Sequence, residues 1–297
     1  MYFYSSFVPV GSESTLVEEV IESKFVSCGP KVQHFLNLNE QLINAKGTLT
    51  NSGTSALLAS MHALNVNSET SIWTSALNFC ATYQISSFLG AACHSLDVNI
   101  KTYNICYEKL EEKLVKAELK GCLPDIIVAV HLGGVLEDMP RLRSLSEKYG
   151  FYIIEDACHA YGVIAPWGET IGECMYSDIS CFSFHGLKTI STGEGGLVTT
   201  QDPNIHHKVS SFVNLGLQRD NPDEPWLVEA VDSGLNLRMS DISAAVGIAQ
   251  FSDLENRKAH RVSQVQTIYK QIKTNSLNVM LQAENSEHMN YFRHLVV

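Results

Sequence analysis

Short apolar runs rich in β-branched residues alternate along this chain with segments whose apolar residues recur at helical spacing. This alternation is typical of an α/β fold with a mainly parallel central sheet. Because each helical segment carries one apolar stripe, we expect it to pack on the sheet. The runs predicted to be strands are 71–75, 92–98, 125–132, 151–157, 178–184 and 196–200.

The C-terminal part of the chain follows a different pattern. From Ser240 onward the residues predict one long helix that leaves the main domain, with basic residues gathering toward Arg261. After Arg261 we expect only a further helical turn or two, a polar stretch and the run HLVV, which could begin a strand. Residues 217–234 hold two prolines and are predicted to form a surface loop. The predicted domains are a large domain at 1–250, followed at 251–297 by a linking helix and the start of an incomplete small domain.

Charge and composition argue against several classes of partner. The chain has 21 lysines and arginines against 32 aspartates and glutamates, and a formal charge of −11 would repel nucleic acid. No apolar run approaches bilayer length, and the N-terminus lacks the basic and apolar regions of a signal peptide, so a cytoplasmic protein without a membrane partner is expected. The histidines form no metal-binding motif, and the eight cysteines form no C-x-x-C pair. We therefore expect no metal site, and reduced, buried thiols.

Ligand-binding residues are expected directly after the strands, because open parallel sheets bind ligands at the carboxyl ends of their strands. After Thr50 comes N-S-G-T-S-A-L, in which Thr54 and Ser55 open a helix. The N-H groups and dipole of a helix N-terminus, with added hydroxyls, could bind a phosphate. Serine, threonine and glycine are also the ordinary capping residues, and capping alone is the stronger explanation of this motif by itself.

The strand at 151–157 brings Asp156 to its end, and His159 follows three residues later. An aspartate in this place could keep a pyridinium nitrogen protonated, and the imidazole could bond a phenolic oxygen of the same ring. Asp156 could equally cap the turn that follows the strand.

A lysine follows the next strand. Ser183 lies at the end of the strand, and Lys188 precedes the glycine-rich turn G-E-G-G. A partly buried lysine can lose its proton and attack an aldehyde. Phe79, after the strand at 71–75, could lie over a flat cofactor, although core packing more often explains an isolated phenylalanine. The sequence contains neither the G-x-G-x-x-G motif of dinucleotide-binding folds nor the Walker motif of nucleoside-triphosphate-binding folds.

Taken together and in order, the motifs G-T-S-A-L, N-F-C-A-T, E-D-A-C-H-A and F-S-F-H-G-L-K with G-E-G-G resemble the DegT/DnrJ/EryC1/StrS family of sugar aminotransferases. The resemblance extends from 25–35 to about residue 262. It implies the large domain of a fold type I pyridoxal-phosphate-dependent transferase, with pyridoxal 5′-phosphate as cofactor. The implied roles are covalent attachment and proton transfer for Lys188, the pyridine nitrogen for Asp156, the phenolic oxygen for His159, ring stacking for Phe79, and phosphate contacts for Thr54, Ser55 and Ser183.

The resemblance also has implications for assembly and reaction type. The segment SGLNLRMSDI resembles one that crosses a dimer interface in this family, so Asn236, with Arg238, is expected to serve the neighbouring subunit's cofactor in a homodimer. His131 lies in V-H-L-G-G, where the family tends to have V-H-L-Y-G, and a structural role is expected for it. A dehydrating branch of the family has histidine in place of Lys188, so the lysine favours transamination.

Three functions remain open on these grounds. The first is transfer of an amino group from glutamate to C4 of a nucleotide-linked 4-keto-6-deoxy sugar; the chain looks closest to transaminases acting on UDP-linked N-acetylhexosamines, on the route to surface polysaccharides or nonulosonic acids. The second is a truncated, non-catalytic homologue that binds the cofactor, because family members continue through a small C-terminal domain. The third is another fold type I reaction, such as elimination on an amino acid. The sugar-family motifs along most of the chain favour the first.

Overall fold

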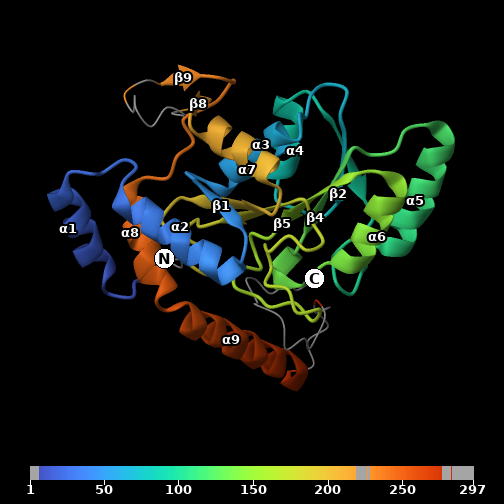
Figure 1. The fold of residues 1–297 in the computed structure, drawn as a ribbon. Coiled ribbons are helices and arrows are strands. Elements are labelled where there is room, and N and C mark those ends of the chain that lie inside the picture. Colours follow the sequence, from blue (N-terminus) through green and yellow to red (C-terminus); the bar gives the residue numbers. More distant parts are fainter. Residues whose placement is uncertain (1–6, 219–225, 227, 276–281, 283–297) are drawn as a thin grey trace.

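A seven-stranded sheet forms the centre of the protein in the computed structural model, which describes residues 7–218, 226, 228–275 and 282 (Figure 1). The strand order is β1-β7-β6-β5-β4-β2-β3, and four of the six neighbouring pairs are parallel, with β7 antiparallel to both β6 and β1. The strands are β1 (Lys46–Thr50), β2 (Ser71–Ser75), β3 (Ala92–Leu96), β4 (Ile126–Val130), β5 (Tyr152–Asp156), β6 (Ile179–Ser183) and β7 (Gly196–Thr200).

All six predicted strands are present, and the prediction of an α/β fold with a mainly parallel sheet is confirmed. Strand β1 was not among the predicted strands. It pairs antiparallel with β7 at one edge of the sheet, from Lys46 opposite Thr200 to Thr50 opposite Gly196. The end of β1 therefore lies beside the start of β7, in the glycine-rich region that follows Lys188.

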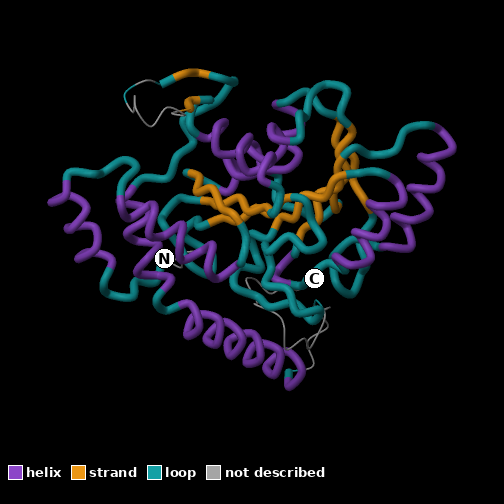
Figure 2. Tube along the Cα trace, viewed as in Figure 1, coloured by secondary structure: helices purple, strands orange, loops and turns teal. Residues whose placement is uncertain are grey.

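Helices cover both faces of the sheet (Figure 2). One face packs against α3, α4 and α7, and the other packs against α5 and α6 toward β3 and against α2 and α8 toward β1. Along β4 the burial follows the two-residue period of a strand: Val128 contributes to the first core and Ile127 to the opposite one. The helices are α1 (Glu13–Ser23), α2 (Pro30–Ile43), α3 (Gly53–Ala63), α4 (Ala81–Phe88), α5 (Tyr107–Lys120), α6 (Met139–Tyr149), α7 (Pro203–Val213), α8 (Asp241–Phe251) and α9 (Leu254–Thr274).

Local sequence explains where several helices begin and end. The Asp202 side chain accepts hydrogen bonds from the first N-H groups of α7, whose first residue is Pro203. Gly150 ends α6 with a φ of 81°, in the left-handed region that glycine adopts without steric cost. Helices α4, α5 and α6 connect β2 to β3, β3 to β4 and β4 to β5, so these strands run in the same direction.

The structure corrects the prediction of one long helix from Ser240. Helix α8 ends at Phe251 and α9 begins at Leu254. At the break, the Ser252 hydroxyl donates to the Ala249 carbonyl at 2.7 Å, so a side chain competes for the backbone groups there. Helix α9 then continues to Thr274, well beyond the turn or two expected after Arg261. The run HLVV lies outside the described residues, and the division into domains at residue 250 stays a prediction.

Two smaller expectations also change. Within the predicted surface loop 217–234, strands β8 (Leu217–Gln218) and β9 (Glu229–Ala230) pair as an antiparallel ribbon. The expectation of buried thiols is wrong for most cysteines: all eight are free, but only Cys174 and Cys181 are buried. None of the described helices is long and apolar enough to cross a membrane.

Candidate active site

The N-terminus of α3 lies against the carboxyl end of β6. The Ser52 side chain caps the helix by accepting the Ser55 N-H at 3.0 Å. A Cβ atom added to Gly53 would lie 2.7 Å from the Ser183 Cβ, closer than real Cβ contacts allow. The absence of a side chain at Gly53 therefore lets the Ser183 hydroxyl approach the first N-H groups of α3, which helix geometry leaves without intrahelical acceptors. This arrangement suits an anion.

The two hydroxyl residues predicted to bind phosphate differ in their surroundings. Thr54 is exposed on the first turn of α3. Ser55 is buried, and its hydroxyl donates to the Asn51 side-chain oxygen at 2.6 Å and lies 2.9 Å from the Ser52 hydroxyl. Ser55 thus takes part in a local capping network with Ser52 and Asn51, whereas Thr54 is exposed.

We expect Gly53→Ala to lower the affinity for a phosphate-bearing ligand by at least about tenfold, because the added methyl group must push α3 away from Ser183. Isothermal titration of the cofactor-free protein with pyridoxal phosphate measures the change. Gly186→Ala is the matched control for thermal stability, since its added Cβ meets nothing within 4 Å. An affinity unchanged in Gly53→Ala would contradict a role for this contact.

Asp156 lies beside Cys158 at the end of β5. Asp156 is buried at the end of β5, and its side chain accepts the Cys158 N-H at 3.1 Å. Burial raises the pKa of the Cys158 thiol well above its usual value, the Asp156 carboxylate raises it further, and the Lys188 ammonium acts in the opposite direction. The thiol therefore feels both charged groups. Strands β5 and β6 are neighbours, with Asp156 opposite Cys181, so the end of β5 lies beside the strand that leads into the segment of Lys188.

The hydrogen bonding of His159 indicates which of its ring nitrogens carries the proton. Its Nδ1 accepts the backbone N-H of Gly133 at 3.2 Å, from the 3-10 turn Leu132–Gly134 that follows β4. A nitrogen that accepts carries no proton, so in the neutral ring the proton lies on Nε2. His159 is half-buried, and in this tautomer Nε2 is the ring nitrogen that can donate.

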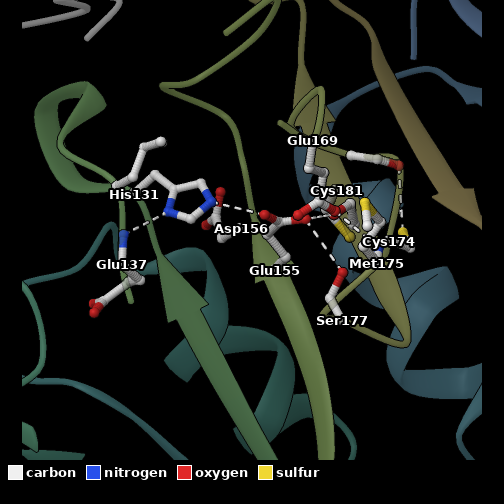
Figure 3. Close-up of polar contacts among 12 residues, drawn as sticks. His131, Glu137, Glu155, Asp156, Glu169, Cys174, Met175, Ser177 and Cys181 are labelled. Atoms are coloured by element: carbon white, nitrogen blue, oxygen red, sulfur yellow. Dashed lines mark hydrogen bonds and ion pairs between the residues drawn. The ribbon is translucent and has the colours of Figure 1, made fainter. Parts of the chain in front are cut away.

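A buried network that the sequence did not reveal supports these strand ends from the other face of the sheet (Figure 3). The His131 Nε2 and a Glu155 carboxylate oxygen are 2.8 Å apart, and both side chains are buried. His131 Nδ1 accepts the Glu137 N-H at 3.1 Å, so the ring proton lies on Nε2 and the Nε2-H donates a hydrogen bond to Glu155. Glu155 also accepts from the Ser177 and Ser180 hydroxyls.

This network is tied to the candidate site through the backbone. The His131 N-H donates to the Asp156 carbonyl at 3.2 Å. Successive side chains of a strand point to opposite faces, so Glu155 faces this network while Asp156 faces away from it. His131 thus holds the ends of β4 and β5 in place, in line with the structural role expected for it. The signal available in the sequence was a pair of acidic residues ending the apolar run FYII.

Glu137 is a further buried acid beside this network. One of its carboxylate oxygens accepts the Ile105 N-H at 2.9 Å. Burial raises the pKa of Glu137 from 4.5 to about 7, opposed by the Ile105 N-H and by His131. Over much of the physiological pH range, the fully buried carboxyl group is therefore partly protonated.

The raised pKa predicts a pH-dependent stability. Between pH 4.5 and about 7 the native state keeps the Glu137 proton that the unfolded state has lost, so the free energy of unfolding falls as pH rises through this window. A shift of this size corresponds to about 3 kcal/mol in all. In Glu137→Gln this contribution should vanish, whereas Glu118→Gln, an exposed control on α5, should keep it. Urea unfolding at pH 5 and pH 8 measures the free energy of unfolding at each pH. An equal change in this free energy between the two pH values in Glu137→Gln and in the unchanged protein would refute the prediction.

The remaining predicted residues have exposed side chains. Phe79 follows β2 and is 67% exposed. Asn236 is exposed, and its backbone pairs with Asn214, whose side-chain oxygen accepts a bond from Arg238 Nη1 at 2.7 Å. The next residues pair with the end of β1, since Arg238 forms a bridge with Thr50. The segment SGLNLRMSDI therefore passes close to the start of α3 in its own chain, with Asn236 turned to the surface.

Comparison with known proteins places this chain in a family. Residues 10–297 match the model of the DegT/DnrJ/EryC1/StrS aminotransferase family. The chain is 31% identical over 265 residues to the spore coat polysaccharide biosynthesis protein SpsC of Bacillus subtilis, covering 86% of this chain and 66% of that protein. It spans about two thirds of the length of the curated relatives it matches.

Solved structures share the fold. PseC of Helicobacter pylori, an aminotransferase involved in the biosynthesis of pseudaminic acid, superposes with a TM-score of 0.86 at 22% identity, over 99% of this chain and 77% of PseC. The putative sugar aminotransferase Spr1654 of Streptococcus pneumoniae, in its PMP form, superposes with a TM-score of 0.85 at 20% identity, over 100% of this chain and 78% of that protein. The chain belongs to the DegT/DnrJ/EryC1/StrS aminotransferase family, whose solved relatives include enzymes in pyridoxal- and pyridoxamine-phosphate forms.

Proposed function

We propose that this chain uses pyridoxal phosphate to transfer an amino group from glutamate to C4 of a nucleotide-linked 4-keto-6-deoxy sugar, of the UDP-N-acetylhexosamine type. The observation that carries the proposal is the close fit of the α3 N-terminus against Ser183 on β6, next to the end of β5 that carries the buried Asp156. An anion site at a helix N-terminus beside a buried carboxylate suits the phosphate and the ring nitrogen of this cofactor.

The donors and acceptors present fit this cofactor group by group. The start of α3 with Ser183 would hold its phosphate, because Gly53 leaves the room that a Cβ would fill. Asp156 would hold the ring nitrogen, and the Nε2-H of His159 would donate to the phenolic oxygen. Lys188 would hold the cofactor covalently through its side-chain nitrogen. In the same proposal Thr54, Ser55 and the stacked ring of Phe79 complete the cofactor contacts.

When bound, the cofactor supplies an electron sink for the pair left when a C-H bond next to nitrogen breaks. Asp156 maintains that sink by keeping a proton on the ring nitrogen through a charge-assisted hydrogen bond. The Lys188 Nζ would carry a proton between the cofactor's C4′ and C4 of the sugar. An amine must be neutral to accept that proton.

The substrate part of the proposal rests on family membership and on the relatives' names. SpsC is named for spore coat polysaccharide biosynthesis, and PseC for pseudaminic acid biosynthesis. A chain of charge −11 repels a sugar nucleotide at long range, so binding requires local N-H groups or cations. The same reasoning applies to the carboxylates of glutamate.

The proposal is tested by mixing the protein, loaded with pyridoxamine phosphate, with a panel of UDP- and dTDP-linked 4-keto sugars and following return of the aldehyde absorbance. Turnover with UDP-linked 4-keto-6-deoxy-N-acetylhexosamines supports the proposal. Turnover with dTDP sugars alone overturns the nucleotide assignment. Cofactor binding without turnover of any sugar favours a non-catalytic cofactor-binding protein.

We further propose a cytoplasmic homodimer, in line with the eight free cysteines and with apolar side chains exposed near the site. Leu77, Phe79 and Leu235 are each more than 40% exposed, and Asn236 lies beside Leu235. We expect light scattering to give twice the chain mass, and Asn236→Ala to weaken cofactor binding without dissociating the dimer. A monomer that binds pyridoxal phosphate as tightly as the dimer would contradict the role of Asn236 in the neighbouring subunit.

A further inference from the structure

One face of α9 lies against the loops that carry the site. Leu254 in its first turn is buried in the same cluster as Phe184 and Ile190, which belong to the loop 184–192 that carries Lys188 (the Lys188 loop). Val265 and Tyr269, further along the same face, pack on Val135 after the turn that contacts His159. In Figure 1, α9 crosses below the sheet as a single long helix. The helix is thus anchored in the core before and after the point at which Arg261 projects from it.

Arg261 holds the backbone of the Lys188 loop. Its Nη2 donates to the Leu187 carbonyl at 3.2 Å and to the Lys188 carbonyl at 3.0 Å. Burial lowers the pKa of Arg261, and the nearby Arg257 lowers it further, yet a guanidinium keeps its charge in proteins. A half-buried cation bound to two successive carbonyl dipoles is a strong local restraint, because charge-assisted bonds exceed neutral ones in strength.

Backbone hydrogen bonds within the Lys188 loop fix its two ends. Arg261 adds a restraint from another element, α9. The Lys188 N-H donates to the His185 carbonyl at 2.8 Å, and the Thr192 N-H donates to the Phe184 carbonyl at 2.9 Å. These bonds close the loop at both ends, and Arg261 restrains the two peptides between them. The direction in which the Lys188 side chain leaves the backbone is determined by those peptides.

We propose that Arg261 is a positioning residue that couples α9 to the loop of Lys188 and so aims the lysine amine at the site; the link to catalysis rests on the function proposed above. Arg261 touches neither the cofactor nor the substrate in this account. It acts through the carbonyls of Leu187 and Lys188. A displacement of α9 would therefore be transmitted to the lysine.

The first test uses the protein without cofactor. Hydrogen exchange of the Lys188 and Thr192 amides should be at least about tenfold faster in Arg261→Met, while the Ala56 amide in α3 keeps its rate. Arg261→Lys, which keeps a charged donor, should restore part of the protection and also serves if the methionine variant folds poorly. Lys258→Met, on the same helix and paired with Glu255, is the matched control and should leave the loop unchanged. Unchanged loop exchange in Arg261→Met, or an equal increase at Ala56, would overturn the proposal.

The second test adds pyridoxal phosphate and follows the visible absorption band with pH. If the Lys188 amine is no longer held in its normal direction, the pH midpoint of this band should shift in Arg261→Met. It should not shift in Lys258→Met, and in Arg261→Lys it should return toward the original value. A purely structural role would lower stability and leave the midpoint in place, which would contradict positioning. If the loop exchange changes as expected but no variant binds pyridoxal phosphate, the proposed function fails while the coupling of α9 to the loop stands.

Discussion

Lys188→Ala should lower the rate of transamination by at least about 1000-fold, because one side chain supplies both the covalent attachment and the proton transfer. The variant should still bind pyridoxal phosphate, since the start of α3, Ser183 and Asp156 remain in place. Single-turnover absorbance with glutamate measures the rate, and equilibrium dialysis measures binding.

The matched control is Lys101→Ala, which removes an exposed lysine from the connection between β3 and α5. It should leave both the rate and the binding unchanged. A Lys188→Ala protein that transaminates at a rate near that of the unchanged protein would remove Lys188 from the reaction, whatever its place in the fold.

Asp156→Asn should slow both half-reactions by about 100-fold while preserving the fold. Asparagine keeps the volume and can still accept the Cys158 N-H, but it loses the charge that keeps the ring nitrogen protonated. A charge-assisted hydrogen bond contributes about 1.5–3 kcal/mol, which sets the scale of the loss. Stopped-flow absorbance with glutamate, and then with the keto sugar, measures each half-reaction.

The matched control is Asp178→Asn, because Asp178 is a half-buried aspartate beside the same sheet. Asp178 lies at the opposite end of β6 and bonds Arg143 at 3.1 Å, so its loss should lower thermal stability without lowering the rate per folded molecule. If both variants lost rate in proportion to their stability, the effect at Asp156 would be structural and the assignment would fail.

The strands were predictable because each is a short apolar run bounded by polar or glycine-rich turns. Strand β7, predicted and observed at 196–200, is an example. β1 was missed because its residues, KGTLT, include glycine and only one large apolar side chain. It becomes a strand by pairing with β7, which is a tertiary effect that propensity does not encode.

The break between α8 and α9 could not be read from periodicity either. Ser252 and Asp253 interrupt the helix by local hydrogen bonding, although the apolar spacing continues on both sides. Residues with a short polar side chain carry this signal only weakly, since they also occur within helices.

At the candidate site, the sequence indicated residue types and their order, and the structure adds their partners. The fit of Gly53 against Ser183, the tautomer of His159 and the buried bond between His131 and Glu155 all join residues far apart in the chain. Such contacts depend on the order of strands in the sheet, and local pattern alone does not determine that order.

The most direct test of the account is borohydride reduction of the unaltered protein after incubation with pyridoxal phosphate, followed by mass spectrometry of its peptides. The account predicts one stable adduct, on the peptide that contains Lys188, and none on the peptide that contains Lys101. A protein that takes up no pyridoxal phosphate, or an adduct spread over exposed lysines with Lys188 unmodified, would contradict it.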